Sequence, residues 1–496
     1  MKRSIASLSV GAVLAVSGIL VWMAMTAPRA SAIPAFSRKY QTSCSTCHSD
    51  YPELNDFGEA FKKNGFKFPK DDETFVKEPP VLLGAKAQKE AFPGAVFPGE
   101  IPGNLPIGFR YSGNFTWNAK QPQALQATGF VPQTDLFVPN TFSIISAGSF
   151  GQNLAFWIDD DISTAGSGTG GGLGDGYLRY NDLGHVFHLP KNSLNVRFGQ
   201  FELDLPFSQA RSIYPSAYDV YSETAVAQPT PTSGQTAFLT TNNPFMLGTP
   251  QRGIEIGGYP NNGNFTWSVA LVDGTNSAYG LGSSITARNT KDVYVRVSQK
   301  FNLERDPESR NAVQAAGATG PHDHTSIRFG GFYYAGNNQL NYGSSQFNFL
   351  GTIDEPFYRA GGDVRFKYRN RFELFGLGMA GHDNDHSVDT VAKTINAAPA
   401  VTYAGGVAGS NFWIHPWLIA YMRYDFVNSP TDFANGVSQY QTRNRFSPGF
   451  QALVRANIKI IGEYQFHWGQ PYTDPLTGNT SYFRANSFVG GIDFAY

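Results

Sequence analysis

The sequence predicts an all-β protein: a transmembrane antiparallel β-barrel of about sixteen strands, preceded by a small N-terminal α-helical module. From residue 106 onward, segments of about ten residues alternate between apolar and polar side chains and are separated by polar turns, which is the pattern of a membrane β-barrel. The final segment, 483–496, alternates in the same way and ends on Tyr496. After the N-terminal apolar run, no apolar stretch is long enough for a membrane helix.

Residues 1–32 are predicted to be a signal peptide. Lys2 and Arg3 precede an apolar run from residue 5 to residue 25, and Ala30-Ser31-Ala32 supplies the small residues of a cleavage site. An uncleaved helical anchor is the alternative. Both alternatives place the rest of the chain outside the cytoplasm. The formal net charge of −1 gives no basic field for nucleic acid.

The run Cys44-Ser45-Thr46-Cys47-His48 contains both cysteines of the chain. Cys-x-x-Cys-His is the attachment signature of c-type haem, in which the two thiols bind the porphyrin and the histidine binds iron. A thioredoxin-like site needs a βαβ setting, and a zinc site needs a second ligand pair. A disulfide across two residues closes almost no loop. We therefore predict one covalent haem c held by Cys44, Cys47 and His48.

Residues 33–75 form the predicted haem module. Asn55 or Asp56 can cap a short helix that carries Phe57 and Phe61 on one face and stops at Gly65. A segment this small cannot form a core alone, so the haem and the inside of the barrel are expected to complete it. Residues 76–105 are rich in Pro and Gly and predict a linker. Residues 106–496 form the predicted porin-like barrel.

The sixth iron ligand is not evident, because residues 33–105 contain no Met and no second His. Either the iron is five-coordinate, or the barrel or a partner supplies the ligand. His415 is the first choice, since alternation places it on the lumen face near the periplasmic start of the strand 412–427. Further candidates, each of which is otherwise a solvated loop histidine, are His185, His188, His322 and His324.

The predicted connections follow the barrel rule of short periplasmic turns and long external loops. Ser410-Asn411 is one such short turn, and 203–250 and 382–400 are among the long external loops. Two periplasmic connections, 182–192 and 302–324, break the rule. Charged residues expected on the lumen face, lining a wet pore or tuning the haem potential, are Arg110, Arg296, Arg365, Glu373, Asp425, Glu463 and Asp493.

A second cluster of metal-binding residue types lies on the opposite rim. It consists of His382, Asp383, Asp385 and His386, with His467 near the same rim. Imidazole and carboxylate groups bind divalent metals such as Fe(II). The simpler interpretation is a polar loop at an exposed tip.

The N-terminal motifs carry a family resemblance. Residues 33–38, the haem motif 44–48, Pro52-Glu53-Leu54-Asn55-Asp56-Phe57-Gly58, Phe61 and Asn64-Gly65-Phe66 resemble the fused outer-membrane monohaem cytochrome–porins, which include iron oxidases of iron-oxidising bacteria. The resemblance covers about forty residues closely, and the barrel in architecture alone. Ser37 stands where Ala is expected.

The resemblance implies one haem, held by Cys44, Cys47 and His48 in the lumen or on the periplasmic side of an outer-membrane barrel. The expected function is an electron conduit between an extracellular donor such as Fe(II) and a periplasmic c-type cytochrome or cupredoxin, so the chain is a candidate Fe(II):cytochrome c oxidoreductase. Members are not all iron oxidases, so the donor is not fixed. The alternatives are a porin-like channel whose haem plug is a redox gate, outward electron transfer, and a soluble exported cytochrome with a β-sandwich.

Overall fold

The computed structural model describes residues 35–496 with gaps, so the expected signal peptide lies outside the described residues. The ranges not described are 1–34, 69–71, 78–80, 83, 85, 95–99, 102, 104–105, 120–132, 165–171, 223–225, 228–237, 241, 244, 261–262, 275–289, 304–324, 343–350, 370, 390–393, 429–431, 435–436, 440–441, 468–470, 474–479 and 483–485.

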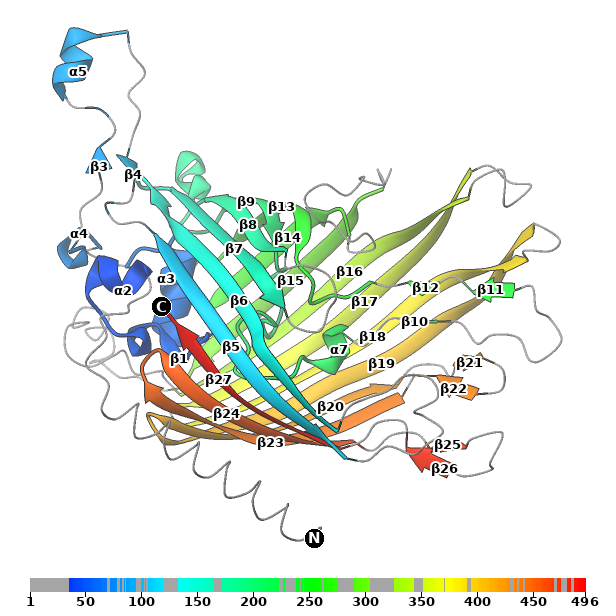
Figure 1. The fold of residues 1–496 in the computed structure, drawn as a ribbon. Helices are drawn as coiled ribbons and strands as arrows, with labels where there is room; N and C mark the ends of the chain where they lie inside the picture. The colour runs from blue at the N-terminus through cyan, green and yellow to red at the C-terminus, as the bar shows by residue number, and fades with distance from the viewer. Residues whose placement is uncertain are drawn as a thin grey trace, which may run out of the picture.

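Sixteen antiparallel strands form one closed barrel (Figure 1), which confirms the predicted fold class. The barrel closes where the last strand pairs with the first, with Ile492 opposite Gly113. The strands are β5 (Ile107–Asn118), β6 (Thr134–Phe150), β7 (Leu154–Thr164), β8 (Leu173–Tyr180), β9 (Asn195–Phe201), β13 (Gln251–Gly258), β14 (Phe265–Val272), β15 (Asp292–Asn302), β16 (Ser326–Tyr342), β17 (Gly351–Tyr368), β18 (Phe372–Asp389), β19 (Thr394–His415), β20 (Leu418–Asn428), β23 (Thr442–Arg455), β24 (Ile458–His467) and β27 (Ser487–Ala495).

The outer face of the barrel is apolar and exposed. On β15, Val293 and Val297 are 38% and 46% exposed, whereas Tyr294 and Arg296 between them are buried in the interior. The same alternation exposes Ile254 on β13 and other aliphatic or aromatic side chains around the wall. A soluble sandwich buries its apolar faces against a second sheet, so this wall faces lipid, and the chain is an outer-membrane β-barrel.

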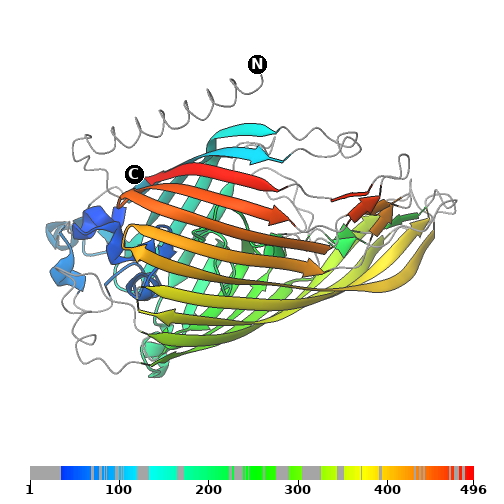
Figure 2. The ribbon, with the colours of Figure 1, turned by 90° about the horizontal axis from the view of Figure 1, so that it is seen from below.

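Several strand boundaries differ from the sequence prediction. The strands β16 to β19 have 17 to 22 residues, about twice the length that spans a bilayer, and they project beyond the wall on one side (Figure 2). The expected loop 382–400 is therefore largely strand. The turn expected at 410–411 lies at Pro416-Trp417 instead, because β19 continues to the residue before proline, which cannot continue the ladder.

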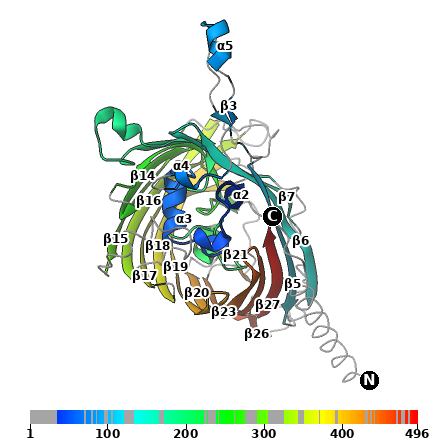
Figure 3. The same ribbon diagram turned by 90° about the vertical axis from the view of Figure 1, so that its left-hand side faces the viewer.

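The N-terminal module lies in one mouth of the barrel, where the C-terminus also ends (Figure 3). We assign this mouth to the periplasm because the short turns lie on this side. The module contains α2 (Ala35–Tyr40), η1 (Cys44–Thr46), β1 (His48–Asp50), β2 (Glu53–Leu54), α3 (Asp56–Lys63) and α4 (Asp72–Phe75). The predicted linker contains β3 (Val81–Leu82), α5 (Lys86–Ala91) and β4 (Glu100–Ile101). None of the helices in the described ranges has the length and apolar character to cross a membrane.

The segment 202–250 enters the barrel, which corrects the prediction of an external loop. Its described part contains α7 (Asp219–Ser222), β10 (Val226–Ala227), β11 (Phe238–Thr240) and β12 (Asn242–Asn243). Aromatic rings of this lumen segment pack on the inner wall, with Phe207 against Phe375 and Phe245 against Tyr334 at ring-centre distances of 4.9 and 4.4 Å. Burying these rings is more favourable than exposing them in a loop.

The predicted lumen charges do face inward, but most are buried in ion pairs. Arg296 binds Asp363 at 2.7 Å, and Arg423 binds Asp425 at 2.6 Å. The carboxylates Asp425 and Glu463 have no exposed surface, so they do not line a wet pore. The module and the lumen segment fill the space in which these charges would otherwise meet water.

Candidate functional site

Charged contacts hold the N-terminal module in the periplasmic mouth. Asp56 at the start of α3 forms an ion pair of 2.5 Å with Lys300, and Glu53 forms one with Arg365. The Arg38 guanidinium donates to the carbonyl of Ile107 at 2.5 Å, where the barrel begins. Each of these contacts joins a residue near the Cys-x-x-Cys-His motif to a barrel strand.

The core of the module is aromatic and includes the barrel wall. Phe36 of α2 contacts Phe61 of α3 edge-on at 5.0 Å and stacks on Phe66 at 5.3 Å. Phe66 in turn meets Trp157 of β7 at 5.6 Å, and Ala155 of the same strand is fully buried in this cluster. The expectation that the inside of the barrel completes the module is therefore confirmed in part, since β7 and, through Ala147, β6 contribute side chains to this cluster.

Asn55 organises the Cys-x-x-Cys-His motif. It is the N-cap of α3: its side-chain oxygen accepts from the Gly58 amide at 2.8 Å. Its side-chain nitrogen donates to the carbonyls of Ser45 and Thr46, and its backbone amide donates to the carbonyl of Cys47 at 3.0 Å. A Cβ at position 58 would overlap that Cys47 carbonyl. The helix can therefore pack on the motif only with glycine there.

The His48 ring is oriented for binding through Nε2. Its Nδ1 lies 3.2 Å from the carbonyl oxygen of Pro52, and because a carbonyl can only accept, Nδ1 carries the proton and Nε2 keeps a free lone pair. Burial lowers the pKa of His48 to about 4. The neutral ring, which is the form that binds metals, therefore predominates at neutral pH.

Cys44, Cys47 and His48 line one cavity of about 450 Å³ between the module, the barrel wall and the lumen segment. This volume lies in the range of cofactor pockets, roughly 300–1,000 Å³. Burial raises the pKa of both thiols, that of Cys47 to about 12. The other lining residues include the rings Phe36, Phe61, Phe66, Phe109 and Trp157 and the cations Lys62, Arg110, Arg211 and Lys459. Apolar walls, two thiols, an imidazole and basic side chains would suit a haem c, which would be held by Cys44, Cys47 and His48.

The structure does not bring His415 to this cavity. His415 ends β19, is exposed, and stacks on Trp417 at 5.6 Å, and it is not among the residues lining the cavity. The sequence prediction placed the turn before His415 and His415 in the next strand. In the structure the turn comes after His415. His185 and His188 lie exposed in or beside η2 (Leu183–Phe187), and His322 and His324 lie outside the described residues. Among described residues, the cavity lining contains no second His and no Met.

The second metal cluster is split by strand geometry. Because His382 and Asp383 are adjacent on β18, their side chains lie on opposite faces: His382 stacks on Tyr358, and Asp383 is buried and binds Arg359 at 2.8 Å. His386 binds Glu355 at 3.2 Å. Asp385 lies on the same strand, and nothing is described of its side chain. Within the described residues, no group of three or more His, Cys, Asp or Glu side chains is arranged to hold a metal ion.

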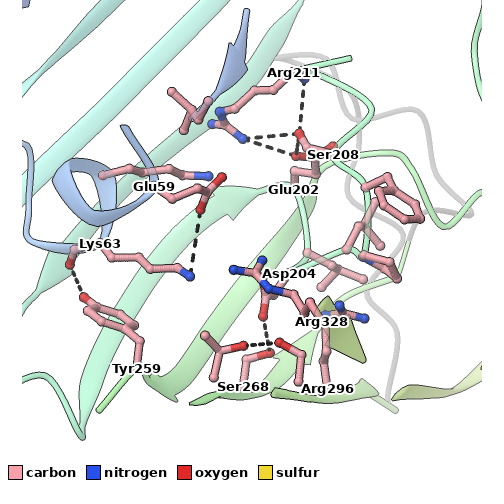
Figure 4. Close-up of a pocket in the computed structure, with 18 of the residues that line it drawn as sticks. Glu59, Lys63, Glu202, Asp204, Ser208, Arg211, Tyr259, Ser268, Arg296 and Arg328 are labelled. Atoms are coloured by element: carbon pink, nitrogen blue, oxygen red, sulfur yellow. Dashed lines mark hydrogen bonds and ion pairs between the residues drawn. The ribbon is translucent and has the colours of Figure 1, made fainter. Parts of the chain in front are cut away.

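A second cavity, of about 170 Å³, lies beside the first and is lined mainly by charged groups (Figure 4). In this view, Glu59 and Lys63 of α3 face Glu202 and Arg211 of the lumen segment. Five residues line both cavities and form the wall between them: Leu54, Lys62, Arg211, Ser212 and Tyr214. No local pattern in the sequence predicts this wall, because its members lie in two distant segments.

The comparisons with known proteins concern the barrel. Neither the protein-family models nor the curated proteins include a match. The chain is similar to the outer membrane channel DcaP of Acinetobacter baumannii, with 12% identity, coverage of 79% of this chain and 96% of that one, and a TM-score of 0.46. It is also similar to Salmonella typhi OmpF in complex with daunomycin (9% identity, 79% and 97% coverage, TM-score 0.46) and to Vibrio cholerae OmpT (9%, 79% and 98%, 0.40).

Proposed function

We propose that this porin-like barrel is an electron conduit of the outer membrane. An extracellular donor, with Fe(II) as the candidate, gives up one electron, and a periplasmic c-type cytochrome or cupredoxin receives it. One covalent haem c, held by Cys44, Cys47 and His48, supplies the one-electron couple. In this proposal the chain acts as an Fe(II):cytochrome c oxidoreductase of the fused cytochrome–porin type.

The main support is the arrangement around the cavity of about 450 Å³. Both thiols and the His48 ring line it, and the contact from Nδ1 to Pro52 leaves Nε2 available. The apolar rings exclude water from a porphyrin, while Arg110 and Lys459 offer positive charge for its carboxylates. The position in the periplasmic mouth suits exchange with a periplasmic carrier.

The filling of the barrel favours a conduit over a diffusion channel. The module occupies the periplasmic mouth through partly buried ion pairs, and the lumen segment packs against the inner wall. A solute would have to displace both. Electron transfer, in contrast, needs no water-filled opening through the barrel.

The test is reduction of the purified full-length protein in detergent by Fe(II), followed in the haem absorption spectrum over a range of pH. We expect Fe(II) to reduce the haem and a small periplasmic-type cytochrome to reoxidise it. Dithionite is the control for a competent haem. Reduction by dithionite but not by Fe(II) at any pH would remove Fe(II) as the donor. Solute-driven swelling of liposomes that depends on haem reduction would favour the redox-gated channel instead.

A further inference from the structure

The charged cavity of Figure 4 has an excess of positive side chains. Eight cationic and six acidic residues line its described walls. We infer that this cavity is a binding site for a small oxyanion, such as phosphate or a carboxylate. The inference rests on the arrangement of charges in this cavity, which shares Lys62 and Arg211 with the cavity proposed for the haem.

Arg328 is the first cation without a salt bridge to a described residue, although it interacts electrostatically with Asp56 and Glu59 at longer range. It lies on β16 between Lys300 on β15 and Arg365 on β17, its partners in the strand register. The module neutralises Lys300 through Asp56, and Glu373 binds Arg365 at 2.9 Å. Arg328 forms no ion pair with a described residue, although it lies in the middle of this row of cations.

Two further cations on the opposite side of the cavity are also without a salt bridge to a described residue. The Arg179 guanidinium, 8% exposed, donates to the backbone carbonyls of Lys62 and Lys63, and its Nε has no partner among the described residues. The Lys62 ammonium makes no hydrogen bond or ion pair with a described residue. Backbone carbonyls carry no net charge, and Lys62 meets the carboxylates of Glu59 and Glu202 only beyond salt-bridge distance, so neither cation has a counter-ion in direct contact among the described residues.

The acidic residues do not cancel this excess. Five of the six lie in ion pairs with cations of the same lining, such as Glu255 with Arg197 at 2.6 Å and Glu202 with Arg211 at 3.3 Å. The sixth, Asp204, accepts from the Ser268 hydroxyl at 3.4 Å. Arg365 is shared by two of these carboxylates, Glu53 and Glu373. Three cations without a salt bridge therefore face Asp204 and one further carboxylate charge, and the remaining excess of positive charge attracts an anion.

The donor types and the size define the ligand class. Guanidinium groups offer paired N–H donors that match the oxygens of phosphate or carboxylate. The volume of about 170 Å³ is below the range of roughly 300–1,000 Å³ that holds larger organic ligands. A small oxyanion fits both the charge and the volume.

The test uses the full-length protein in detergent at low ionic strength, with inorganic phosphate as the probe and isothermal titration calorimetry as the measurement. Wild type should bind phosphate saturably. Arg328→Gln should weaken binding about tenfold, as expected for one charge-assisted contact, and Arg328→Lys should restore part of the loss. Lys191→Gln is the matched control, because Lys191 is exposed in the periplasmic connection between β8 and β9.

Lys62→Gln provides a second variant on the module side, so a folding defect in one variant does not remove the test. Retention of the barrel is checked by its heat-dependent mobility in detergent gels. Absence of saturable binding of phosphate, sulfate and citrate to folded wild type would overturn the inference. Equal phosphate affinity in wild type, Arg328→Gln and Lys62→Gln, or tighter binding of Mg²⁺ than of phosphate, would also overturn it.

Discussion

Two segments occupy the interior of the barrel, and different forces hold them there. The N-terminal module, residues 35–77, meets the strands mainly through charges, such as Asp56 with Lys300. The lumen segment packs mainly through apolar rings, such as Phe245 on Tyr334, with Asp219 bound to Arg445 as a charged anchor. The lumen segment is therefore part of the barrel core, whereas the module is a separate unit whose attachment depends on salt and pH.

The largest expected effect comes from a variant that alters the module and leaves the lumen segment unchanged. Replacing both Cys44 and Cys47 by Ser should abolish covalent haem, because no other thiol exists in the chain. The module should then become protease-sensitive, while the lumen segment keeps its protection, since its core is entirely protein. Haem staining of denaturing gels and limited proteolysis measure the two effects. Covalent haem in the double variant would contradict the assignment of the attachment site.

The next effect concerns the lumen segment. Tyr221 is fully buried among barrel residues, so Tyr221→Ala should cost about 3–5 kcal/mol, the usual loss for a buried aromatic side chain. Guanidinium titration of the detergent-solubilised barrel measures it. Phe187→Ala, at a position 63% exposed, is the control and should be near neutral. Equal guanidinium midpoints of unfolding for the two variants would show that the lumen segment adds nothing to the stability of the barrel core.

A smaller effect concerns the module core. Gly58→Ala places a Cβ against the Cys47 carbonyl, and such overpacking costs about 1–3 kcal/mol. Haem per chain should fall severalfold, because the motif and α3 no longer pack together. Gly94→Ala adds a Cβ with no atom within 4 Å and should leave the haem content unchanged. A fully loaded Gly58→Ala variant would contradict the close packing.

The smallest effects come from the two carboxylates that dock the module. Burial opposes ionisation of Asp56, but Lys300 outweighs it and holds the Asp56 pKa well below its usual range. Burial, with the Glu373 carboxylate, raises the pKa of Glu53 to about 7. Asp56→Asn should therefore loosen docking at pH 7 by about 1 kcal/mol. Glu53→Gln should leave docking at pH 7 nearly unchanged, because Gln is neutral like protonated Glu53 and Glu373 still binds Arg365.

The same two groups set a pH dependence with opposite signs. The Asp56 contribution is present above its unfolded pKa of about 4 and is lost as pH falls further. The Glu53 carboxyl favours docking when protonated, so its contribution is lost as pH rises from about 4 through about 7. Protection of α3 amides from hydrogen exchange should be greatest between about pH 4 and 7 and fall in high salt. Protection that rises steadily above pH 7 would contradict these directions.

The sequence predicted the features that depend on local periodicity or on one motif. Period-2 alternation found the sixteen strands, and the cysteine spacing located the cavity. The path of 202–250 could not be predicted, because its apolar residues, such as Phe207 and Tyr221, follow no period. The one available signal was the number of aromatic residues in a supposed external loop. His415 lies away from the cavity because β19 continues to this residue, so that it ends the strand, exposed at the rim beside the turn.

The ion pairs of the interior were also beyond prediction. Arg296 and Asp363 are 67 residues apart, and their pairing depends on the register of three neighbouring strands. The lack of a salt bridge between Arg328 and any described residue depends on the same register and on where the module docks. Such contacts follow only from the assembled barrel.

The most direct test of the central claim is the intact mass of the mature chain purified from outer membranes. The account predicts a mass greater than that of the polypeptide by one haem, retained after extraction with acidified acetone and assigned by peptide mapping to the segment containing Cys44 and Cys47. A mature chain with the mass of the polypeptide alone would contradict it.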